Sequence, residues 1–165
     1  APGGVVPSWS REALLAALEP EAARSLRGGG TLALIDLRIE APRDVKFDIA
    51  RLSGSMRAML RPYDLLAVAE DAPGRCWRVV LPLSGGEGPL PAAHRLCTLV
   101  EDFLDSEGGV EERGIRVGLG ISVLPADAAN TEEMVENAAA AAVRALAHAE
   151  PSAVVLHEAT QEAVV

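Results

Sequence analysis

The sequence is poor in aromatic residues and in positive charge. Aromatic side chains make up only 3% of the 165 residues, so leucine, valine, isoleucine and alanine must form the core. The 24 acidic residues outnumber the 15 basic ones, which gives a formal net charge of −9. Proteins that bind duplex nucleic acid present a basic face, so nucleic acid is not an expected partner. A few local arginines can still bind a small anion in such a protein.

Patterns for metal binding, disulfides and membrane insertion are also missing. Cys76 and Cys97 form no CxxC motif, and the three histidines lack metal-ligand spacing, so we expect neither a metal nor a cofactor. The apolar neighbours of the two cysteines are typical of reduced, buried thiols in a cytoplasmic protein. No apolar run approaches the ~18 residues of a membrane span, and no signal peptide is present. Because the first residue is Ala, we expect a domain of a longer chain, cytoplasmic even if that chain is membrane-associated.

Apolar periodicity and turn residues predict alternating helices and strands. Residues 1–8 are rich in proline and glycine, as in a linker. Four helices are expected. The first, at 10–27, is interrupted at Pro20, and the others lie at 44–61, after the loop 84–91, and at 131–148. Strands are expected at 31–37, 65–70, 75–83, 116–125 and 153–157. Asn130 and Glu133 have the spacing of a helix-capping pair. The order predicts an α+β domain whose mostly antiparallel five-stranded central sheet is flanked by helices.

Four sequence strings resemble the GGDEF domain of diguanylate cyclases, in the right order and with fitting gaps. They are LALIDL (32–37), MRAMLRPYDLLA (56–67), WRVVLP (77–82) and VGLGISVLPADAANTEEMVENAAAAA (117–142). The resemblance covers almost the whole chain from residue 31 onward and implies a GGDEF or nucleotide-cyclase-like fold. It also implies a division into a linker with an N-terminal helix, 1–30, and a degenerate GGDEF-like domain, 31–165.

The resemblance shows where the chain departs from the family's catalytic pattern. The family's hairpin tip reads Gly-Gly-Asp/Glu-Glu-Phe, whereas this chain has PGRCW at residues 73–77. Asp36 matches the family's first metal-binding aspartate. Arg75 stands where the resemblance places the partner acid of that metal site, and it is expected to form an ion pair with Asp36. Arg38 replaces the second aspartate. Because cyclisation requires magnesium to neutralise developing phosphate charge, we expect an inactive pseudoenzyme without a metal site.

The GTP-binding residues that the resemblance implies are altered as well. The segment between Asp36 and Arg61 is shorter than in the family, and the base-reading Asn and Asp have no equivalents, although Asp44 or Lys46 falls near them. Leu146 stands where the family has a phosphate-contacting lysine. We therefore expect GTP to bind weakly at best.

The sequence Arg61-Pro62-Tyr63-Asp64 matches the family's RxxD inhibitory motif, which binds the product cyclic di-GMP. The arginine fork suits guanine O6 and N7 or phosphate oxygens, and an aspartate accepts from guanine N1–H and N2–H. The alternative is structural: Arg61 ends a helix favourably, Pro62 stops that helix, and Asp64 caps the turn.

Further arginines are candidates to neutralise the phosphates of this ligand. Arg57 precedes Arg61 by four residues and shares its helical face. Arg95, on the following helix, lies about one turn from the position where the family often has an arginine, which aligns with Leu99 here. The alternative for both is a solvated surface arginine, and for Arg95 the two interpretations are equally consistent with the sequence.

Two functions therefore compete. The first is an inactive receptor that binds cyclic di-GMP at Arg61 and Asp64 and relays occupancy to a neighbouring domain or a signalling partner protein. The second is a domain that only forms a homodimer or docks onto another protein, without a nucleotide. A residual cyclase or GTP-binding protein is disfavoured by the missing acids of the hairpin.

Overall fold

The structure is a computed structural model that describes residues 5–72, 74–109, 114–148, 152–157 and 162–164. Its helices are α1 (Arg11–Arg27), α2 (Ile49–Met59), α3 (Leu90–Ser106) and α4 (Thr131–His148). Its strands are β1 (Ser8–Trp9), β2 (Thr31–Glu40), β3 (Leu65–Ala69), β4 (Cys76–Leu83), β5 (Arg116–Leu124), β6 (Ser152–His157) and β7 (Glu162–Val164).

One mixed sheet contains all the described strands, in the order β1-β3-β4-β2-β5-β6-β7. The central pairs are antiparallel, as predicted, whereas β1–β3 and β5–β6 are parallel. The five predicted strands are all present. The two outermost strands were not predicted because two or three residues are too few to show an alternating pattern.

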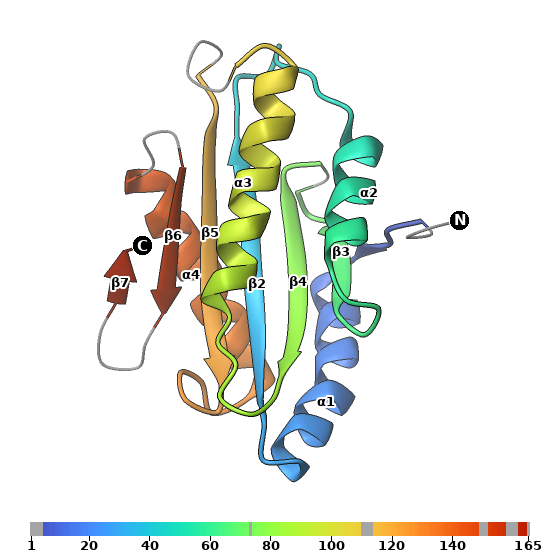
Figure 1. The fold of residues 1–165 in the computed structure, drawn as a ribbon, viewed down its shortest axis with the longest axis vertical. Coiled ribbons are helices and arrows are strands. Elements are labelled where there is room, and N and C mark those ends of the chain that lie inside the picture. The colour runs from blue at the N-terminus through green and yellow to red at the C-terminus, as the bar shows by residue number, and fades with distance from the viewer. Residues whose placement is uncertain (1–4, 73, 110–113, 149–151, 158–161, 165) are drawn as a thin grey trace.

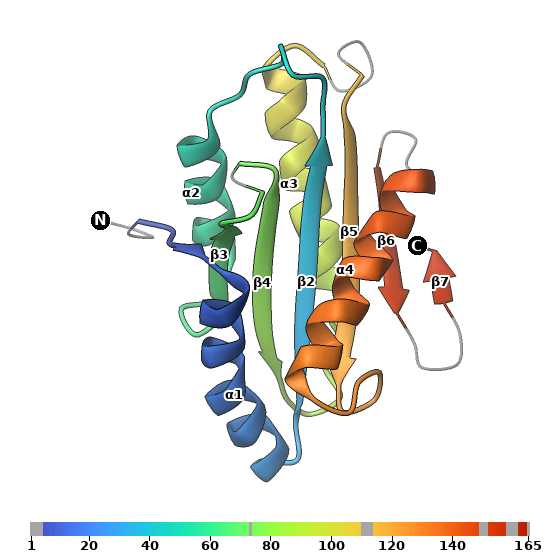
Figure 2. The same ribbon diagram turned by 180° about the vertical axis from the view of Figure 1, so that it is seen from behind.

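Helices cover both faces of this sheet. Helices α2 and α3 lie on the face seen in Figure 1, and α1 and α4 lie on the opposite face, seen in Figure 2. Alternate residues of β2 point to opposite faces. Ala33, Ile35 and Leu37 pack into the cluster beneath α2 and α3, whereas Leu32 and Leu34 pack beneath α1 and α4. Because it alternates with Ile35 and Leu37, Asp36 belongs to the α1/α4 face.

Two helices differ from their predicted limits. Pro20 does not interrupt α1, which runs unbroken from Arg11 to Arg27. The proline ring lies on the exposed side, while Leu14, Leu18 and Ala22 are buried in the core. Helix α2 begins at Ile49 rather than at residue 44, because the Asp48 side chain caps it by accepting from the Arg51 N–H at 3.0 Å.

Helix α4 matches its prediction and packs unusually close to the sheet. Asn130 Oδ1 accepts the Glu133 N–H at 2.9 Å, which confirms the predicted cap. A Cβ atom added to Gly120 of β5 would lie 2.2 Å from the Ala138 carbonyl oxygen, so glycine is required for this approach. Among the described residues, no helix has both the length and the apolar character needed to cross a membrane.

Candidate ligand site and the Asp36 cluster

The first candidate site lies at the turn between α2 and β3, where Arg61 and Asp64 form a tight ion pair. Arg61 Nε and Nη2 donate to the two carboxylate oxygens of Asp64 at 3.2 and 3.3 Å. The Arg61 backbone N–H also donates to Oδ2 at 2.8 Å, which is the turn cap offered above as the structural alternative. Asp64 is only 2% exposed, whereas 36% of the Arg61 side chain is exposed. The hydrogen bond to Asp64 raises the pKa of Arg61.

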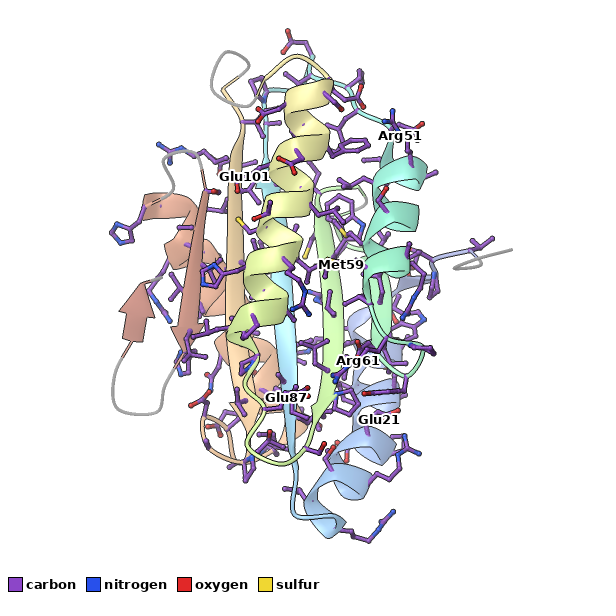
Figure 3. The ribbon with its side chains drawn as sticks, viewed as in Figure 1. Glu21, Arg51, Met59, Arg61, Glu87 and Glu101 are labelled. Carbon is purple, nitrogen blue, oxygen red and sulfur yellow. The ribbon has the colours of Figure 1, made fainter. Side chains whose placement is uncertain are left out.

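The rest of the Arg61 guanidinium contacts neighbouring elements. Nη2 donates to the Pro82 carbonyl of β4 at 3.0 Å, and Nη1 donates to Glu87 Oε1 at 2.8 Å. The Tyr63 ring centre lies 4.7 Å from the guanidinium carbon. Figure 3 shows Arg61 and Glu87 on the α2/α3 side of the sheet, near the ends of those helices. The sequence alone pointed to neither Glu87 nor the stacked Tyr63, because both contacts depend on the folded turn.

A cavity of about 430 Å³ opens beside this ion pair. Its polar lining comes from Arg61, Asp64, Glu87 and Arg95. Its apolar lining includes Met59, Leu81 and Leu83. A second cavity, of about 520 Å³ between α2 and α3, shares Met59 and Arg95 with the first and is also lined by Leu99. The fold therefore brings the exposed Arg95 to the same cavity as Arg61.

Arg57 takes a different position. Its Nη1 donates to the Asp64 carbonyl at 2.8 Å, and its Nη2 donates to the Arg61 carbonyl at 2.5 Å. Arg57 is not among the described residues that line either cavity. Its guanidinium instead holds the turn that carries Arg61 and Asp64.

The second cluster surrounds Asp36, on the opposite face of the sheet. Asp36 is 1% exposed and accepts from Arg38 Nε at 2.8 Å and Nη2 at 3.2 Å. Arg78 Nε lies 3.9 Å from Asp36 Oδ2, and the Cys76 thiol lies 3.5 Å from Oδ1. The hydrogen bond to Asp36 raises the pKa of Arg38, and burial raises the pKa of Cys76 to about 12.

The expected pairing of Arg75 with Asp36 is wrong. Arg75 Nη1 donates to the Ala41 carbonyl at 3.1 Å. The antiparallel register places Arg78 directly opposite Asp36, and Arg38 shares the Asp36 face because side chains alternate along a strand. Alternation could have identified Arg38 from sequence, but the β2–β4 register was needed to find Arg78. Pro73, at the predicted hairpin tip, lies outside the described residues.

The Asp36 region does not fit a divalent cation. Its carboxylate is already paired with Arg38, and a second guanidinium stands nearby, so a cation would meet positive charge. In the part of the chain that the structure describes, no three His, Cys, Asp or Glu side chains group as a metal site. Gly74, at φ 76°, packs so closely on Ile49 that an added Cβ would lie 2.9 Å from its Cδ1. Gly74 therefore lies against the first residue of α2.

The fold of this chain is similar to those of solved GGDEF domains and of a diguanylate cyclase. The GGDEF domain of TpbB (YfiN) from Pseudomonas aeruginosa matches with a TM-score of 0.68 and 19% identity, over 94% of this chain and 92% of that one. The diguanylate cyclase SiaD, solved with its activator SiaC from Pseudomonas aeruginosa, matches with a TM-score of 0.65 and 21% identity, over 89% of this chain and 58% of that one.

A third match includes a bound nucleotide. The GGDEF domain of DgcB from Caulobacter crescentus, in complex with c-di-GMP, has a TM-score of 0.59 and 16% identity, over 96% of this chain and 95% of that one. No protein-family model matches the chain, and no curated protein matches it in sequence. The structural likeness shows that the chain has the α+β fold of GGDEF domains, which confirms the fold predicted from sequence.

Proposed function

We propose that this chain is a catalytically inactive GGDEF-like domain that binds cyclic di-GMP and relays its occupancy to a neighbouring domain or partner protein. The observation that carries this proposal is the cavity lined jointly by Arg61, Asp64 and Arg95. A solved domain of the same fold holds c-di-GMP, which makes this ligand the first to test.

The chemistry of the cavity suits a phosphorylated nucleotide. Two guanidinium groups, from Arg61 and Arg95, offer donors to phosphate oxygens or to a guanine edge. Apolar side chains such as Met59 and Leu81 can contact the faces of the bases. Asp64 is nearly fully buried, and both of its carboxylate oxygens accept hydrogen bonds from Arg61. We therefore assign Asp64 the role of holding the Arg61 side chain in position.

The Asp36 cluster supports the absence of cyclase activity. Cyclisation of two GTP molecules requires metal ions that neutralise charge developing on the phosphates. Here the carboxylate that would hold the metal is paired with Arg38 and lies beside Arg78. With magnesium or manganese and GTP, the pure protein should form no cyclic di-GMP. Product formation that disappears in Asp36→Ala would contradict this assignment.

Titration calorimetry with cyclic di-GMP tests the receptor proposal. Arg61→Ala should weaken binding about tenfold to a hundredfold, because it removes a charge-assisted contact of ~1–3 kcal/mol. Arg11→Ala is the matched control, since Arg11 is also partly exposed and ion-paired but lies on α1, outside the described lining of the cavity. Absence of binding by the wild type, or equal affinities for all three proteins, would overturn the proposal.

The competing function is dimerisation or protein docking without a nucleotide. It is favoured by the internal pairing of Arg61, whose contacts with Asp64, Pro82 and Glu87 give it a structural role. The structure of SiaD bound to SiaC shows that a protein containing this fold can be solved with a partner. Sedimentation with and without cyclic di-GMP separates the two functions, because only the receptor proposal requires the ligand to bind.

A further inference from the structure

The contacts of Arg61 leave little of its guanidinium free for a ligand. An arginine side chain has five N–H donors, one on Nε and two on each terminal nitrogen. Nε and one Nη2 donor point to Asp64, the other Nη2 donor points to Pro82, and one Nη1 donor points to Glu87. At most one N–H therefore remains for an incoming phosphate.

The three acceptors around Arg61 are not equally replaceable. Asp64 is buried, and the Pro82 carbonyl belongs to the central strand β4. Glu87 has a side chain that is 44% exposed, and it lies on the loop between β4 and α3. Gly85 and Gly86 of this loop have φ values of 59° and 82°, and their surroundings are open. Glu87 is thus the acceptor that can leave without disturbing the core.

We propose that Glu87 is an internal competitor for the ligand. Its carboxylate accepts from Nη1 of Arg61, both residues line the cavity, and an anionic ligand binds by displacing the carboxylate. This inference rests on the proposed function and adds a residue that sets the affinity of the same site. A phosphodiester or diphosphate can replace the lost charge contact, whereas a neutral nucleoside cannot, so Glu87 also selects for anionic ligands.

The test compares Glu87→Gln with the wild type in titrations with cyclic di-GMP. Removing the carboxylate should tighten binding about twofold to fivefold, as expected for loss of one competing exposed ion pair. It should also steepen the fall of affinity with salt, because Arg61 then begins without a partner on Nη1. Glu40→Gln is the matched control, because Glu40 is an exposed acid at the end of β2 that lies away from the cavity. The other end of β2, at Thr31, pairs with Leu83, which lines the cavity.

The same substitution in Arg61→Ala distinguishes competition from general repulsion. Without Arg61, Glu87 has no guanidinium to occupy, so Glu87→Gln should no longer tighten binding. A gain that persists at full size in this background would overturn the inference, as would equal affinities of wild type and Glu87→Gln. Either result leaves the proposed function standing if the wild type binds.

A second probe covers the case in which the proposed function fails. If neither wild type nor Glu87→Gln binds cyclic di-GMP, inorganic pyrophosphate is titrated while the Arg61 Nε–H resonance is followed by NMR. Tighter pyrophosphate binding by Glu87→Gln supports the competition without the receptor function. No difference between the two proteins, including no binding by either, overturns it.

Discussion

The chain contains two aspartate–arginine pairs that look alike in their hydrogen bonds and differ in their surroundings. Asp36 with Arg38 and Asp64 with Arg61 each join a nearly fully buried carboxylate to two guanidinium nitrogens. Around Asp36 a second, buried arginine, Arg78, adds positive charge on the sheet face. Around Arg61 the surroundings include a cavity and an exposed acid. Both acids are buried, so the pairs differ in what surrounds the arginine, which is a second guanidinium near Arg38 and a cavity beside Arg61.

The largest expected effect comes from removing the acid of the more enclosed pair. Asp36→Ala leaves Arg38 and the 9%-exposed Arg78 side chain without their buried counter-charge. The free energy of unfolding should fall by about 3–5 kcal/mol, measured by urea denaturation. Asp71→Asn is the control, because Asp71 is 75% exposed and lies 3.7 Å from Arg78, so its effect should stay within ~0.5 kcal/mol. Similar small effects for both would contradict the contrast.

Next in size is the acid of the pair that borders the cavity. Asp64→Asn keeps the shape but cannot accept from Arg61 through both carboxylate positions. We expect a loss of about 1–3 kcal/mol in the free energy of unfolding and weaker cyclic di-GMP binding, because Arg61 is no longer held in place. Calorimetry at a temperature where the variant is folded separates the two effects. If the variant is as stable as the wild type and binds cyclic di-GMP with the same affinity, Asp64 has no role in the ligand site.

A smaller effect is expected for Arg57, which supports the same turn. Arg57→Ala removes two hydrogen bonds to the carbonyls of Arg61 and Asp64. The free energy of unfolding should decrease by about 1–2 kcal/mol, while the salt dependence of ligand binding should remain that of the wild type. If that salt dependence becomes shallower instead, Arg57 contacts the phosphates and its sequence-based assignment to the ligand site holds.

The last effect concerns the thiols and is absent at neutral pH. Both cysteines are free and buried, and burial raises the pKa of Cys76 to about 12 and that of Cys97 to about 11. The ordinary pKa of a thiol is 9.0, so the unfolded chain loses these protons at lower pH than the folded chain does. The contribution of the thiols to the free energy of unfolding is therefore fully present below pH 9. Above pH 9 it declines by about 1 kcal/mol per thiol and pH unit. Labelling with a thiol reagent at pH 8 should be about a hundredfold slower in the folded than in the denatured protein. Equal rates would show that both thiols are accessible.

Much of the fold could be predicted because its determinants are local. The apolar run 31–37 and the cap formed by Asn130 and Glu133 depend on residues a few positions apart. Pro20 was misjudged, because the burial of its helix neighbours outweighs the hydrogen bond that a proline removes. For the candidate site, sequence identified Arg61, Asp64 and Arg95, whose shared cavity became visible only in the structure.

The sequence by itself determined the succession of helices and strands, the apolar strand at 31–37 and the position of the Arg61 turn, since these follow from residues that are close together in the chain. Only the tertiary structure decided that Arg78, and not Arg75, lies beside Asp36, and that Glu87 reaches Arg61 across 26 residues of sequence. The reason is physical. Strand register and the position of the loop depend on how both faces of the sheet pack at the same time. That packing involves residues far apart in the chain, so no short stretch of the sequence specifies it.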